Sequence, residues 1–83
     1  MAQGRKYDVI AFDAMGDVIT TAIKDTVKDA TGISRSWLRF DNVASVRVLR
    51  TVNGKMSLYK VFVNNNGKHC EIDSNGTVRV IRI

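Results

Sequence analysis

Three Asn-Gly pairs in the C-terminal half constrain the fold of this 83-residue chain more than any other feature. They stand at Asn53-Gly54, Asn66-Gly67 and Asn75-Gly76. Asn-Gly supplies the two positive φ angles that a type I′ hairpin turn requires, and the segments between the pairs are rich in β-branched and apolar residues. The pattern predicts four consecutive antiparallel strands, over residues 44–52, 55–63, 68–73 and 77–83.

The N-terminal half is predicted to add one strand and one helix. Residues 6–12 are expected to form the strand. In residues 17–31, apolar side chains recur at spacings of three and four, which is the pattern of an amphipathic helix. Asp13 and Asp17 are candidates for its N-cap, and Gly32 is expected to end it. The predicted order is β-α-β-β-β-β, an α+β fold in a single domain over residues 1–83, with the helix packed on a four- to five-stranded antiparallel meander.

Two-residue turns also fix which side chains share a face of the sheet. The face expected to pack against the helix carries Val46, Val48, Tyr59, Val61, Val63, Cys70 and Ile72. Cys70 is therefore predicted to be buried and unreactive. A three-residue turn at Gly76 is expected to place Val78 and Val80 on that face as well. The opposite face is predicted to carry the partner-binding residues Arg47, Leu49, Met56, Leu58, Lys60 and Phe62.

This second face is too apolar to be freely solvated, and a protein with one helix has no obvious second layer to cover it. The N-terminal segment or the connector at 34–42, which holds Trp37, Leu38 and Phe40, could cover it. Otherwise the face is an interface, because a contiguous exposed apolar area usually marks one. The partner would then be another protein or a second copy of the chain.

No combination of residues in the sequence indicates catalysis. His69 and Cys70 are neighbours on a predicted strand and point to opposite faces, so they cannot form a nucleophile–base pair. The acidic residues are spread over separate elements. One cysteine excludes an internal disulfide, and one histidine beside it argues against a structural zinc site. We therefore predict a non-enzymatic protein without metal or cofactor.

The net charge of +5, from 13 Lys and Arg against 8 Asp and Glu, permits an acidic partner. The basic residues are dispersed, and none of the aromatic-interleaved motifs of RNA-binding folds is present. Nucleic-acid binding is thus the alternative to protein binding. No apolar stretch is long enough to span a membrane, and residues 1–6 do not resemble a signal peptide. The sequence as it stands predicts a cytoplasmic protein, or an extracytoplasmic one if a signal peptide has been removed.

Residues 17–83 resemble the PepSY and PepSY-like domains. In that family a helix precedes strands joined by short Gly turns, with an aromatic residue before a valine and a final Asp-x-x-Gly. Tyr59-Lys60-Val61 and Asp73-Ser74-Asn75-Gly76 stand at the corresponding places, although the chain lacks the prolines usual in the family. The resemblance implies a binding or peptidase-inhibiting module without catalytic residues. The strand order is also similar to the cystatin-type fold, but the inhibitory loop motifs of cystatins are missing.

Overall fold

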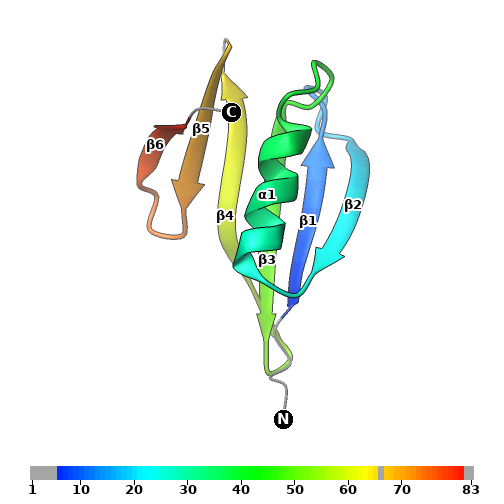
Figure 1. Cartoon of the computed structure of the whole chain (residues 1–83), viewed down its shortest axis with the longest axis vertical. Helices are drawn as coiled ribbons and strands as arrows, with labels where there is room; N and C mark the ends of the chain where they lie inside the picture. Colours follow the sequence, from blue (N-terminus) through cyan, green and yellow to red (C-terminus); the bar gives the residue numbers. More distant parts are fainter. Residues whose placement is uncertain (1–5, 66, 82–83) are drawn as a thin grey trace.

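A computed structural model describes residues 6–65 and 67–81, and it shows one helix lying on a six-stranded antiparallel sheet (Figure 1). The elements in chain order are β1 (Lys6–Phe12), β2 (Val18–Lys24), α1 (Val27–Trp37), β3 (Ser45–Val52), β4 (Lys55–Asn65), β5 (Lys68–Asp73) and β6 (Val78–Ile81). The strands lie side by side in the order β2-β1-β3-β4-β5-β6. The predicted α+β class and antiparallel sheet are confirmed, whereas the number of strands and their order along the chain are not.

The C-terminal meander follows the three Asn-Gly pairs as predicted. Asn53 and Gly54 have φ angles of 52° and 80°, as a type I′ turn between β3 and β4 requires. Asn65 pairs with Lys68 across the second turn. The third turn is a three-residue loop, closed by a hydrogen bond from the Asp73 N–H to the Thr77 carbonyl at 3.1 Å. Gly76 has a φ of 87° within it. Asn66 and the last two residues of the predicted final strand, 82 and 83, lie outside the described residues.

The N-terminal half differs from the prediction, because residues 18–24 form a strand and not a helix. β2 pairs with β1 across a loop that ends in Gly16, whose φ is 88°. Asp13 does not cap a helix; its Oδ1 accepts hydrogen bonds from the backbone N–H groups of Met15 and Asp17, each at 2.9 Å. Five of the seven residues of β2 are β-branched, a composition that favours a strand and weakens a helix.

The helix begins at Val27, ten residues after its predicted start at residue 17. Thr26 is the N-cap, and its side chain accepts a hydrogen bond from the Asp29 N–H at 3.1 Å. The helix runs through Gly32, which therefore does not end it, and includes the first part of the predicted 34–42 connector. Ser34 is fully buried inside the helix, and its hydroxyl donates to the Ala30 carbonyl at 2.7 Å.

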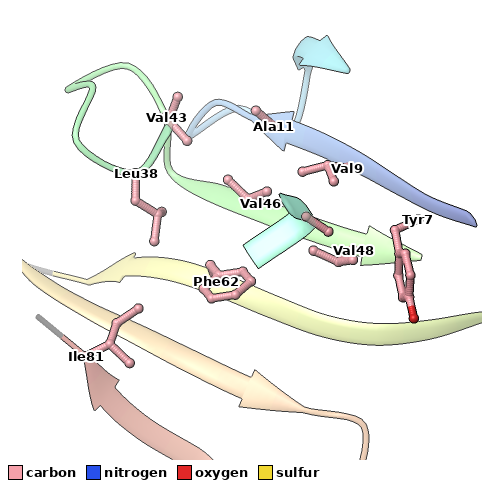
Figure 2. Close-up of a cluster of buried hydrophobic side chains, with 10 residues drawn as sticks. Tyr7, Val9, Ala11, Leu38, Val43, Val46, Val48, Phe62 and Ile81 are labelled. Carbon is pink, nitrogen blue, oxygen red and sulfur yellow. The ribbon is translucent and has the colours of Figure 1, made fainter. Parts of the chain in front are cut away.

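The core lies between α1 and the β1, β3 and β4 strands. Figure 2 shows side chains from these three strands pointing into one cluster, among them Val9, Val48 and Phe62, each no more than 1% exposed. Leu38 and Val43, from the segment after the helix, close the same cluster. The β2-α1-β3 connection crosses β1, so the helix covers the middle of the sheet and leaves β5 and β6 to one side (Figure 1).

Candidate functional site

A bulge in β4 decides which side chains reach the two faces of the sheet. Leu49 pairs with Leu58, but Val48 pairs with Lys60, so Tyr59 is an extra residue in the ladder. Tyr59 lies on the helix side, where its ring meets the ring of Tyr7 edge-on at 5.7 Å. Beyond the bulge, every residue of β4 points to the face opposite the one that an uninterrupted ladder would give it.

The predicted assignment of faces is therefore wrong for the second half of β4 and for the strands that follow it. Phe62 is in the core with 0% exposure, in place of the predicted Val61 and Val63. This register encloses the large aromatic side chain completely and leaves the two smaller valines half-buried on the other face. Cys70 and Ile72 pair with Val63 and Val61 as predicted, but on the face away from the helix.

We call this second surface the open face. All six strands contribute apolar side chains to it, and nothing in the described part of the chain packs over it. Its exposed apolar residues are Val18, Ile23, Met56, Leu58, Val78 and Val80. Its half-buried apolar residues are Ile10, Phe12, Leu49, Val61, Val63, Cys70 and Ile72.

Four of the six predicted partner-binding residues lie together on the open face: Arg47, Leu49, Met56 and Leu58. The other two do not, because Phe62 is in the core and Lys60 lies on the helix side with its ammonium group 3.0 Å from a Glu71 carboxylate oxygen. Val78 and Val80, predicted for the core side, belong to the open face. Cys70 is half-buried on this face and not fully buried as predicted.

The predicted 34–42 connector does not cover the open face. Leu38 and Val43 pack into the core on the helix side, and Trp37 lies against the same cluster. Phe40 is 59% exposed. The N-terminal segment, the other predicted cover, lies outside the described residues up to position 5.

A hollow of about 310 Å³ lies within the open face, over β2, β1, β3 and β4. It is lined by Asp8, Ile10, Thr21, Ala22, Ile23, Leu49 and Met56. Asp8 supplies the one carboxylate in this apolar lining. Arg47 is the diagonal neighbour of Asp8 across the β1–β3 ladder, because Asp8 pairs with Leu49 and Ile10 pairs with Arg47. The Arg47 guanidinium nevertheless lies over the Phe12 ring, 4.9 Å from its centroid.

The helix side carries a second polar arrangement, centred on the buried carboxylate of Glu71. Lys60 Nζ, Arg35 Nη2 and Arg79 Nη2 lie 3.0, 3.6 and 3.8 Å from its oxygens. These cations come from β4, α1 and β6, so the ion pairs join the helix to the side of the sheet that it does not cover. The carboxylate itself compensates part of their charge, which makes this a structural cluster and a weak candidate for binding an anion.

Sequence reasoning missed the contribution of β1, β2, β5 and β6 to the open face. One signal for the N-terminal strands was present: Asp13-x-x-Gly16 repeats the Asp73-x-x-Gly76 pattern of the last hairpin. In both loops the Asp side chain accepts two backbone hydrogen bonds and the Gly has a positive φ. The bulge at Tyr59 had no comparable signal, because residues 61–63 are all apolar and suit either face.

Within the part of the chain that the structure describes, no group of three or more His, Cys, Asp or Glu side chains could hold a metal ion. In the same ranges, no helix is long and apolar enough to cross a membrane. His69 and Cys70 lie on opposite faces of β5, since their partners on β6 are the buried Ile81 and the exposed Val80.

No protein-family model matches the chain, and no curated protein or solved structure is significantly similar to it.

Proposed function

We propose that this chain is a small non-catalytic module that binds another protein through its open face. The observation that supports the proposal is the exposure of apolar side chains on β2, β4 and β6, beside half-buried apolar side chains from β1, β3 and β5. Met56 and Leu58 are 59% and 44% exposed near the β3–β4 turn, and Val80 is 67% exposed on the edge strand β6. A contiguous apolar surface of this extent is costly in water and usually marks a docking site.

The chemistry of the open face favours protein over nucleic acid. Among the described residues, Arg47 is the single basic side chain near its centre, while Lys6 and Lys68 stand at strand ends. Three other cations, Lys60, Arg35 and Arg79, surround Glu71 on the helix side. Nucleic acid requires a continuous basic surface that neutralises several phosphates. Inhibition or regulation by protein contact, as the PepSY resemblance implies, is part of the same proposal.

Affinity capture from an extract of the source organism, with the chain immobilised, tests this function. We expect proteins that are retained by the wild type and lost with Leu58→Asp, because the new charge would be buried in the contact. Met15→Asp is the matched control, since Met15 is 85% exposed in the β1–β2 loop, outside the strands that form the open face. It should retain the same proteins as the wild type.

The salt dependence of the affinity distinguishes protein binding from nucleic-acid binding. Apolar contacts should survive an increase in salt from about 50 to 200 mM, whereas a protein contacting several phosphates loses on the order of a thousandfold in affinity over that range. Capture of nucleic acid that is insensitive to Leu58→Asp and lost in salt would overturn the proposal in favour of nucleic-acid binding.

A further inference from the structure

The charged residues within the open face are self-complementary. Asp8 on β1 and Arg47 on β3 flank Ile10, and their positions are diagonal neighbours in the ladder. No ion pair joins them in the described part of the chain; Arg47 lies over Phe12, at the other end of β1 from Asp8. The surface therefore presents one carboxylate in an apolar hollow and one guanidinium beside it.

We propose that a second copy of this chain covers the open face, and that Arg47 of each copy enters the other copy's hollow and pairs with Asp8. This inference rests on the proposed function and names the partner. In a two-fold dimer, a contact from residue i to residue j is repeated from j to i. A single type of ion pair therefore satisfies both carboxylates and both guanidinium groups.

The size of the open face fits a stable dimer. The chain extends 43 × 25 × 19 Å, which limits the area of this face to about 1,000 Å². A stable interface buries about 800 Å² on each partner, so most of the open face would be used. The 19 Å dimension holds one sheet and one helix. A second sheet packed at about 10 Å would supply the layer that the open face lacks.

The composition of the open face also fits a second copy. Homodimer interfaces are more apolar than other interfaces and contain few charged residues at their centre. Asp8 and Arg47 cancel, so the centre of the face is neutral although the chain carries a net charge of +5. A strongly acidic or strongly basic partner would leave one of these two side chains buried next to a like charge or without a partner.

Charge reversal tests both the dimer and its pairing. Sedimentation equilibrium should show a wild-type dimer at about 100 μM, because a specific interface has micromolar or tighter affinity. Leu58→Asp should be monomeric, and Met15→Asp should dimerise like the wild type. Asp8→Arg and Arg47→Asp should each weaken the dimer about tenfold or more, and the double variant should recover to within a few-fold of wild type.

A cross-link checks the pairing without reversing any charge. Arg47→Lys keeps the cation and provides an amine that a carbodiimide can join to the Asp8 carboxylate. In a mixture of ¹⁴N- and ¹⁵N-labelled copies, we expect peptides joined between position 47 of one isotope and Asp8 of the other.

Each contrary result has a distinct meaning. A wild type that is monomeric at about 100 μM overturns the second copy as partner, while the capture experiment decides separately whether another protein binds. A dimer in which the double variant is no better than the single variants, or one without the mixed-isotope cross-link, overturns the pairing of Arg47 with Asp8.

Discussion

The two faces of this sheet are built by the same strands but differ in solvent exposure: one is covered by the helix and the other is not. On the helix side, Val9, Val46 and Phe62 have no exposure, and the only buried charge, among the described residues, is compensated by three cations. On the open face, Leu58 and Met56 are as apolar but remain accessible to water. Strands that are apolar on both sides are typical of sheets with layers on both faces. The difference indicates that one face forms the core and the other remains accessible to water.

The largest effect that would separate the two faces is on stability. Phe62→Ala should lower the free energy of unfolding by about 3–5 kcal/mol, because it leaves a cavity in the core of a small protein. Leu58→Ala, on the open face of the same strand, should cost less than about 1 kcal/mol in the monomer. Chemical denaturation followed by the fluorescence of Trp37 measures both.

Protein concentration sharpens this comparison. At about 1 μM the Leu58→Ala variant should melt close to the wild type, whereas at about 100 μM the wild type should gain stability from dimerisation that the variant lacks. A Leu58→Ala variant as unstable as Phe62→Ala at the lower concentration would mean that the open face also belongs to the core.

A smaller effect concerns the part of the helix side that α1 leaves uncovered. Glu71→Gln should destabilise the fold by about 1–3 kcal/mol, because it leaves Lys60, Arg35 and Arg79 close together without their carboxylate. The partial exposure of these cations keeps the cost below that of a fully buried pair. Thermal unfolding compares this variant with Asp41→Asn, a matched control at an exposed position. Equal unfolding temperatures for the two variants would show that the cluster does not join the helix to β5 and β6.

The C-terminal hairpins could be predicted from sequence because their turns are specified locally. Asn53-Gly54 and Gly76 have the positive φ angles that such turns need, and the neighbouring strands pair around them. The hairpin of β1 and β2 depends on the same kind of loop, at Asp13 to Gly16. Its signal in the sequence was masked by Ile19, Ala22 and Ile23, whose spacing also fits a helix. In a short segment, strand propensity and pairing with β1 outweighed that spacing.

The open face could be predicted only in part, because the residues that it carries depend on a single extra residue in β4. An uninterrupted β4 would place Phe62 on the same face as Leu58. The bulge at Tyr59 instead places Phe62 in the core and Val61 on the open face. Residues before the bulge were therefore assigned to the correct face, as for Met56 and Leu58. Residues after it were not, since the gain from burying Phe62 is a tertiary effect that the local pattern does not contain.

The smallest expected effect is on the reactivity of Cys70, which reports whether the open face is covered. Its neighbours across the ladder are Val63 and the exposed Val80, so a second copy on this face would shield the thiol. A thiol reagent such as dithiobis-nitrobenzoate should label the half-buried Cys70 readily in dilute protein. For a dimer with a Kd of about 1 μM, the rate at about 100 μM should fall about tenfold, in proportion to the remaining monomer.

The Leu58→Asp variant makes this labelling specific to the interface. Leu58 lies on the adjacent strand β4, but well before Val63, the residue of β4 that pairs with Cys70. The substitution should therefore remove the concentration dependence without altering the rate in dilute protein. The Met15→Asp control should keep the concentration dependence of the wild type. A thiol that stays unreactive in dilute Leu58→Asp protein would mean that the chain itself covers Cys70, and the contrast between a covered and an open face would then not hold at β5.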